Sequence, residues 1–181
     1  VEERGMADDI QYAGGRCGYG MAYDRLHDYP RTPACGWRKR GQENEALGRS
    51  LGGFTTKIHA ACDSHGNPLR FILTGGQASD YTQALALIDG MRTDALLADK
   101  GYDADYMLEA AENMGAIAVI PPKSNRKMPR TYDEELYKER NLIERLFNKL
   151  KHFRRIATRY DKTAASFMAW LHIAAIYLWL K

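Results

Sequence analysis

The chain of 181 residues is 45% hydrophobic and 27% charged, which is the balance of a globular domain with its own core. Its net charge of +3 is too small for composition alone to indicate a nucleic-acid partner. Cys17, Cys35 and Cys62 have neither paired nor metal-type spacing. This spacing fits a protein of the reducing cytosol.

Residues 1–44 are predicted to be poorly structured. The first 50 residues hold eight of the sixteen glycines and show no apolar period of the helical or the strand kind. The opening VEERGMADD does not resemble a signal peptide. The pattern changes abruptly at Gly48, so a structured domain is expected over residues 45–181.

From there, strand and helix patterns alternate along the chain. Strands are predicted at 55–63, 69–74, 94–101 and 116–122. Helices are predicted at 80–91, 103–115, 137–151 and 167–180. The turn SHGNP joins the first two strands into a hairpin, Asp80 is a candidate N-cap, and Gly115 ends the second helix. This order predicts an α/β fold, with a mixed sheet flanked by helices.

The helix YKERNLIERLFNKLK, residues 137–151, has an unusual polar face. At about 100° per residue, Tyr137, Arg140, Glu144 and Lys151 lie within about 60° of one another, opposite the leucines. A face that combines an acid, two bases and a phenol fits plain surface, and it also fits one wall of a site.

Positive charge gathers after this face. Between residues 145 and 162 the only acid is Asp161, and the basic residues are Arg145, Lys149, Lys151, Arg154, Arg155, Arg159 and Lys162. Such a run fits a solvated face and a phosphate-binding stripe equally well.

The terminal stretch FMAWLHIAAIYLWL contains 14 residues and a histidine. It is too short to span a bilayer, so a buried core helix is expected, with Trp170 and Trp179 in the core. No membrane partner is expected.

Two acids are candidates for catalysis. In open α/β sheets, sites form at the carboxyl ends of strands, and Asp99 ends the apolar strand ALLAD. This carboxylate and Glu144 on a later helix can converge on Mg²⁺, which prefers oxygen ligands and keeps positions open for phosphate. Two such ions, about 3.5–4 Å apart, serve phosphodiester chemistry. Arg140 and Lys151 would then meet the phosphates.

Four motifs resemble those of bacterial insertion-sequence DDE transposases of the type-five group. YKERNLIERLFNKLK carries Tyr, Arg, Glu and Lys at the spacing of the family signature, and LLADKGYDAD is similar to the motif of its second catalytic Asp. LGRSLGGFTTKIHAACDSHGNPLRFILTGGQASD and KHFRRIATRYDK also resemble the family. The likeness runs from Glu45 to the C-terminus.

The resemblance implies a ribonuclease-H-like fold that cleaves element ends and joins them to target DNA. Asp99 would be the second acid and Glu144 the third, and the complete site would hold two Mg²⁺ or Mn²⁺ ions. Double-stranded DNA is the expected partner, with a homodimer on DNA and a cytoplasmic, nucleoid-associated protein. The expected DNA-contacting residues are Tyr137, Arg140, Lys151, Arg154, Arg155 and Arg159.

The first acid of this family has no counterpart in the predicted elements. Its motif, similar to IDST on the first strand, matches nothing before Glu45. Asp24 and Asp28 lie in no predicted strand, and Asp63 lies in the hairpin turn. We therefore expect a sheet that lacks its first central strand, and a chain that is unstable and inactive alone.

The genetic code offers an explanation for this gap. Codons for DRLHDYPRTPACG, residues 24–36, read one nucleotide later, can give Ile-Asp-Ser-Thr-Ile-Ile-Arg-Ala-His-Gln-His-Ala. That peptide resembles the motif of the first Asp. Residues 1–36 would then be translated out of frame, with a −1 slip near WRKRG.

Three alternatives remain beside the transposase. The chain could be a non-catalytic DNA-binding product that acts as an inhibitor or subunit, or a nuclease that hydrolyses without joining. A zinc site at His59, Asp63 and His65 is the third, although the residues around Asp63 are turn formers and favour a plain hairpin tip.

Overall fold

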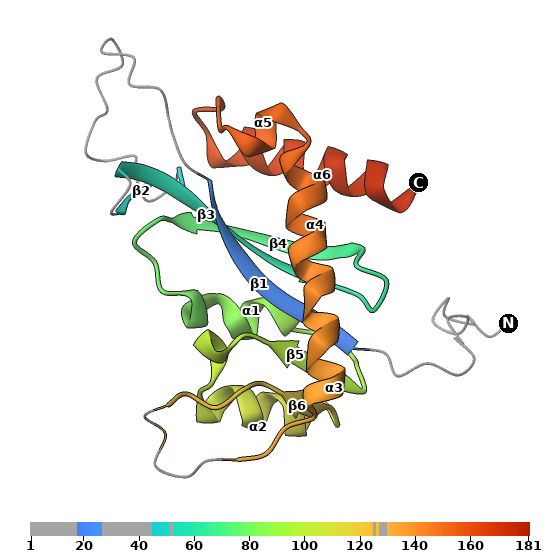
Figure 1. Ribbon diagram of the computed structural model, residues 1–181. Coiled ribbons are helices and arrows are strands. Elements are labelled where there is room, and N and C mark those ends of the chain that lie inside the picture. Colours follow the sequence, from blue (N-terminus) through green and yellow to red (C-terminus); the bar gives the residue numbers. More distant parts are fainter. Residues whose placement is uncertain (1–17, 27–44, 51–52, 125, 127–129) are drawn as a thin grey trace, which may run out of the picture.

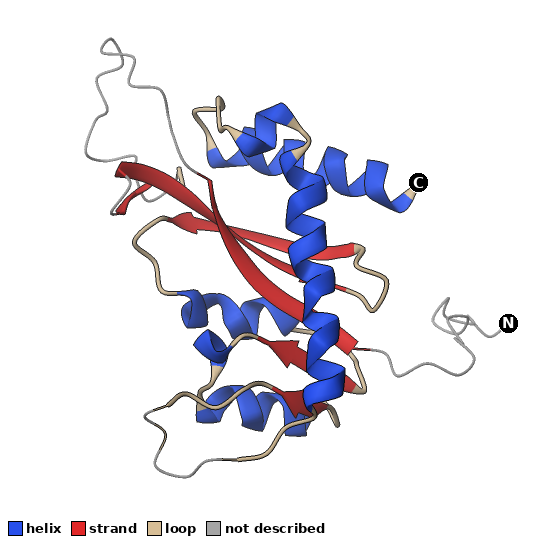
Figure 2. Cartoon of the chain, viewed as in Figure 1, coloured by secondary structure: helices blue, strands red, loops and turns tan. Residues whose placement is uncertain are grey.

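The structure is a computed structural model that describes residues 18–26, 45–50, 53–124, 126 and 130–181. One mixed sheet has the strand order β2-β3-β1-β5-β6, and β4 also pairs with β3. The strands are β1 (Gly18–Leu26), β2 (Gly48–Ser50), β3 (Gly53–Cys62), β4 (Pro68–Gly75), β5 (Ala95–Ala98) and β6 (Ile117–Val119). The pairs β1–β5 and β5–β6 are parallel, and those of β3 are antiparallel. The predicted mixed α/β sheet is confirmed (Figure 2).

Helices cover both faces of this sheet. They are α1 (Ala84–Ile88), α2 (Asp105–Asn113), α3 (Glu134–Tyr137), α4 (Asn141–Lys151), α5 (Arg154–Ala157) and α6 (Ala164–Trp179). Short 3-10 turns are η1 (Asp80–Gln83), η2 (Lys100–Tyr102) and η3 (Lys138–Arg140). Apolar residues of α4, α5 and α6 form one core cluster with β3 and β4, and those of α1 and α2 form another with β5. Figure 1 shows α4 crossing in front of β1.

The centre of the sheet holds a strand that the sequence does not predict. β1 pairs with β3 on one side and with β5 on the other, and Met21 is aligned with both Ala61 and Ala98. The expected absence of a first central strand is therefore not confirmed. Asp24, which the sequence places in no strand, lies on β1 opposite Ile58. The other residues of the segment 1–44, including most of those assigned to a shifted reading frame, lie outside the described residues.

The predicted hairpin is confirmed as β3 and β4. Its turn is closed by Asp63, whose Oδ1 accepts hydrogen bonds from the backbone N–H groups of His65 (2.9 Å) and Asn67 (2.8 Å). Gly66 has φ of +78°, a value that a residue with a Cβ rarely adopts. Asp63 therefore serves the turn, as the hairpin interpretation requires.

The predicted helix at 80–91 is shorter than expected and begins differently. It consists of η1 followed by the five residues of α1. Asp80 does not cap it, because Ser79 occupies the N-cap position and the Asp80 carboxylate accepts a hydrogen bond from the buried Lys57 ammonium, 2.7 Å away. A buried ammonium requires such a partner, which takes precedence over local capping.

The terminal helix α6 is buried on one face only. Phe167, Leu171 and Ala174 are buried, whereas Ile173 and Ile176 are 54% and 59% exposed. The predicted core position of Trp179 is wrong: its ring is half exposed, and its Nε1 donates to the Pro68 carbonyl across 2.9 Å. Within the part of the chain that the structure describes, no helix has the length and apolar content needed to cross a membrane.

Candidate two-carboxylate site

Asp99 follows directly on β5, at the carboxyl end of a strand that parallels both of its neighbours. It caps η2, with its Oδ1 accepting from the Lys100 N–H across 2.7 Å. Leu97, two residues earlier, packs with Leu136 of α3 in a small core cluster that Tyr137 borders. Because strand residues alternate between faces, Asp99 is placed on this same α3 side of the sheet.

The predicted helix at 137–151 is interrupted at its signature residues. α3 ends at Tyr137, η3 covers Lys138–Arg140, and α4 begins at Asn141. In a 3-10 turn, residues three apart eclipse one another, and the Arg140 guanidinium carbon lies 5.5 Å from the centre of the Tyr137 ring. The turn therefore stacks two side chains that a regular helix would separate by about 60°.

Arg140 connects this stack to the second acid. Its Nη2 lies 2.7 Å from Oε1 of Glu144, one helical turn further along. The Glu144 side chain remains 55% exposed. The phenol, the guanidinium and the carboxylate thus follow one another from the end of α3 through η3 to the first turn of α4, and exposure increases towards Glu144.

The phenol of Tyr137 is within electrostatic reach of both acids. Burial raises the pKa of the Tyr137 phenol, Arg140 lowers it, and the negative charges of Asp99 and Glu144 raise it, with Tyr132 contributing in the same direction. The Tyr132 ring meets that of Tyr137 edge to face, with centroids 5.5 Å apart. Two carboxylates that are 45 positions apart in sequence therefore both act electrostatically on one side chain.

Two carboxylates suit a hard divalent cation but do not complete a cage for one. Among the described residues, no group of three or more His, Cys, Asp or Glu side chains could hold a metal ion. Asp99 has a second oxygen, and Glu144 is exposed, so both can offer ligands to Mg²⁺ or Mn²⁺. Within the described residues, these two carboxylates fit such an ion in part.

The basic residues expected to contact DNA differ in their surroundings. Lys151 and Arg154 are exposed. Arg155 lies 4.7 Å from the Trp170 ring centre and 3.6 Å from Asp161.

Arg159 has a structural position instead of an exposed one. It is only 3% exposed, and its guanidinium donates to Thr56 Oγ1 across 2.5 Å and to the carbonyls of Asp161 and Lys162, each across 3.0 Å. This group ties α5 and the following turn to β3, so we do not retain it among the DNA-contacting residues.

The zinc alternative finds no support in the hairpin. His59 is buried within β3, its Nε2 is 2.8 Å from Thr74 Oγ1, and burial lowers its pKa to about 4. Asp63 is engaged by the turn. Asp80 raises the His59 pKa and Lys57 lowers it, but both effects are smaller than that of burial.

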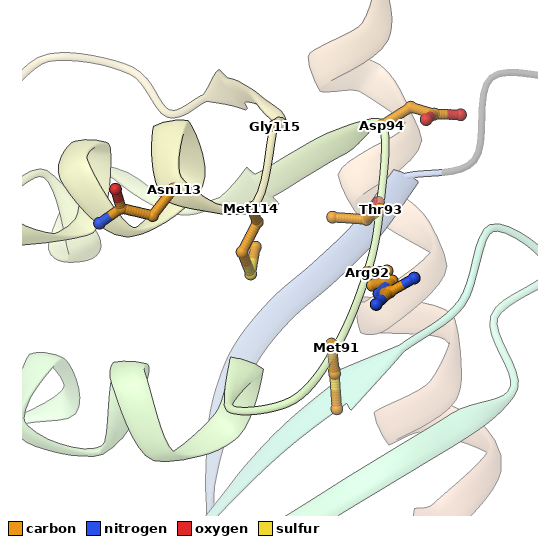
Figure 3. A pocket seen from close by; sticks show the side chains of 7 residues that line it. All are labelled: Met91, Arg92, Thr93, Asp94, Asn113, Met114 and Gly115. Carbon is orange, nitrogen blue, oxygen red and sulfur yellow. The ribbon is translucent and has the colours of Figure 1, made fainter.

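A pocket lies at the other end of the parallel strands, before β5 and β6 begin (Figure 3). Its lining residues are Met91, Arg92, Thr93, Asp94, Asn113, Met114 and Gly115. Asp94 precedes β5 and Asp99 follows it, so this pocket is separate from the two acids.

Comparison with known proteins identifies the class of protein. The family model described as "Transposase DDE domain" matches residues 26–179. The chain therefore belongs to the DDE transposases, a family whose domain implies a ribonuclease-H-like fold. The match begins before residue 45, the predicted start of the structured domain.

Two relatives place the chain among bacterial insertion-sequence transposases. It is 43% identical over 129 residues to a protein of Brucella ovis named as a transposase for insertion sequence element IS6501, covering 70% of this chain and 99% of that protein. It is 32% identical over 121 residues to a protein of Burkholderia cepacia named as a transposase for insertion sequence element IS402, covering 60% of this chain and 55% of that protein. The predicted family is confirmed.

Proposed function

We propose that Asp99 and Glu144 are the second and third acids of a transposase site that cleaves insertion-sequence ends and joins them to target DNA. The observation that supports this proposal is that Asp99 follows β5 on the side where α3 packs, and that both carboxylates exert an electrostatic effect on Tyr137 at the end of α3. When bound, two Mg²⁺ or Mn²⁺ ions would supply activation of the attacking oxygen and stabilisation of the leaving one.

The chain's own residues would orient the DNA around these acids. Arg140 keeps Glu144 in place through a 2.7 Å ion pair, and its planar guanidinium suits phosphate oxygens. Lys151, on the same polar side of α4, would meet a phosphate further along the strand. Tyr137 supports Arg140 by stacking.

We further propose that exposed cations beyond α4 hold the DNA backbone. Arg154 is exposed, and Arg155 is 53% exposed beside Trp170. Each phosphate contact that is lost weakens binding similarly for all DNA sequences and reduces the salt dependence of binding.

We expect Arg154→Ala to lower DNA affinity about tenfold at low salt. Fluorescence anisotropy with labelled DNA measures this affinity. Arg70→Ala is the remote control, since Arg70 donates to carbonyls of α1 and of the following turn.

The first acid is proposed to be supplied by the shifted reading frame across residues 24–36. On this account the 181-residue polypeptide binds DNA but transfers no strand. A chain rebuilt with the Asp-Ser-Thr codons in frame would regain activity. The second candidate function, a DNA-binding product that acts as an inhibitor or subunit, applies to the polypeptide before that repair and is favoured by the exposed cations near the end of α4.

A strand-transfer assay with labelled element ends, Mg²⁺ and plasmid target tests both parts. We expect no joined product from the 181-residue chain, product from the repaired chain, and none from its Asp99→Asn or Glu144→Gln variants. Product from the unrepaired chain would contradict the proposed gap, and Asp24→Asn would then test whether the acid on β1 fills it. A repaired chain that cleaves without joining would be a nuclease.

A further inference from the structure

Asp103 is a buried acid outside the two-carboxylate site. It joins the turn that follows Asp99 to the segment that leads to Glu144. The Asp103 side chain is 1% exposed. Its Oδ1 accepts from Arg126 across 2.6 Å and from Arg130 across 3.1 Å, and its Oδ2 accepts from the Lys123 N–H across 2.8 Å. Burial alone raises the pKa of Asp103, but these three donors lower it below its ordinary value.

These contacts connect parts of the chain that are 20 or more positions apart. Asp103 ends the short turn η2, four residues after Asp99. Arg126 and Arg130 belong to the segment that leads from β6 to α3, and Arg130 also donates to the Ile120 carbonyl across 2.7 Å. In Figure 1 the residues from Arg130 onward lead to α3.

The segment continues directly into the Tyr137 side of the site. Tyr132 follows Arg130 by two residues and packs edge to face on Tyr137. From Tyr137 the chain proceeds through η3 to Glu144. Asp103 therefore lies at a joint between the turn that follows Asp99 and the segment that leads to Glu144.

We propose that Asp103 is a positioning residue, whose buried contacts with Arg126 and Arg130 set the placement of Glu144 relative to Asp99 and thereby the affinity of the site for a divalent cation. The proposal rests on the proposed function of those two acids. Supporting groups around metal ligands commonly change metal affinity by about 10–100-fold when removed. Since Asp103 acts through the backbone, we expect the lower end of this range.

Asp105 provides a matched control. Its carboxylate also pairs with Arg126, but it is 81% exposed. An exposed ion pair contributes little, whereas a buried carboxylate with three donors fixes the geometry of its partners. Asp103→Asn and Asp105→Asn each remove one negative charge near the same guanidinium, so a general charge effect would change both variants alike.

The test follows Mn²⁺ binding by the full chain through paramagnetic broadening of the Tyr137 resonance in ¹³C-tyrosine-labelled protein, assigned with Tyr137→Phe. We expect Asp103→Asn to raise the Mn²⁺ concentration for half-broadening about tenfold, and Asp105→Asn to leave it unchanged. Arg126→Gln is the second variant, expected to act in the same direction as Asp103→Asn, and it carries the test if that variant does not fold. Circular dichroism establishes which variants are folded.

The outcomes separate the two levels of the proposal. If Mn²⁺ broadens Tyr137 in the parent chain and Asp99→Asn abolishes this, the two-acid site stands. Equal half-broadening concentrations for Asp103→Asn and Asp105→Asn would then overturn the role of Asp103. If Mn²⁺ broadens Tyr137 equally in the parent chain and in Asp99→Asn, or broadens it in neither the parent chain nor the chain repaired at residues 24–36, the site itself is overturned.

Discussion

Two buried polar side chains, one on β3 and one just after α5, show how single residues fix this fold. His59 is kept neutral within the sheet, and the Arg159 guanidinium donates to Thr56 and to the carbonyls of Ala46, Asp161 and Lys162. Neither contributes to the proposed chemistry. Changes at either side chain are expected to alter the free energy of unfolding, because a buried polar group is costly when it loses its partners or gains a charge.

His59 should make the stability of the fold depend on pH. Its pKa is lowered from 6.5 in the unfolded chain to about 4 in the fold, so the unfolded state takes up the proton first. The stabilisation is therefore complete above pH 6.5 and is lost as the pH falls towards 4, by up to about 3 kcal/mol. Between pH 7 and 4, the free energy of unfolding in urea should fall more steeply for the parent chain than for His59→Gln. The variant His65→Gln, at the exposed hairpin tip, should behave like the parent chain.

Arg159→Ala should destabilise the fold without a specific loss of DNA affinity. Removing the guanidinium leaves the buried Thr56 hydroxyl and the carbonyl of Lys162 without this donor, which costs about 3 kcal/mol in total. Arg159→Lys should recover only part of the lost stability, because an ammonium cannot reproduce the planar array of donors of a guanidinium. Wild-type stability of Arg159→Ala together with weakened DNA binding would return Arg159 to the DNA-contacting set.

At the scale of elements, the 3-10 turn η3 decides how the signature residues meet. The sequence predicts a continuous helix, because propensity and apolar spacing do not distinguish one 3-10 turn within a helical pattern. The turn brings Arg140 over Tyr137 and leaves it within reach of Glu144. The proximity of Tyr137, Arg140 and Glu144 is thus predictable from the sequence, and the structure adds the contacts among them.

Arg140→Gln tests this arrangement. Because Arg140 lowers the pKa of the Tyr137 phenol, its removal should raise that pKa further, and Lys138→Gln, exposed on the same turn, should leave it unchanged. The measurement is a ¹³C titration of labelled tyrosine up to the alkaline limit of the folded chain. An unchanged Tyr137 pKa in Arg140→Gln would mean that the stack does not persist in solution.

At the scale of the whole molecule, the least predictable feature is the central strand. GYGMAYDRL is rich in glycine and lacks the alternation that marks a strand. The position of β1 in the sheet is determined by its neighbours β3 and β5, which have strong apolar patterns, and is not indicated by its own sequence. The hairpin, β5, β6, α2 and the apolar terminal helix are predictable, because each carries its own periodicity or turn residues. The contacts of Asp103 are not, because its donors follow it by 20 or more positions.

Met21→Pro tests the place of β1. Met21 is aligned with partners on both sides, and a proline in a central strand removes a ladder hydrogen bond and costs about 3 kcal/mol or more. Met21→Val keeps the backbone N–H and should lower the free energy of unfolding in urea much less. Equal stability of both variants would contradict a central β1 and would favour the shifted-frame peptide as the native first strand.

The central claim is that Asp99 and Glu144 share one site around Tyr137. Its most direct test is the titration of the Tyr137 phenol in the parent chain, in two variants and in a control. Both carboxylates raise the Tyr137 pKa, so Asp99→Asn and Glu144→Gln should each lower it relative to the parent chain. Exposed Glu109→Gln on α2 is the control and should not change it. A Tyr137 pKa that responds to only one of the two acids would contradict a common site.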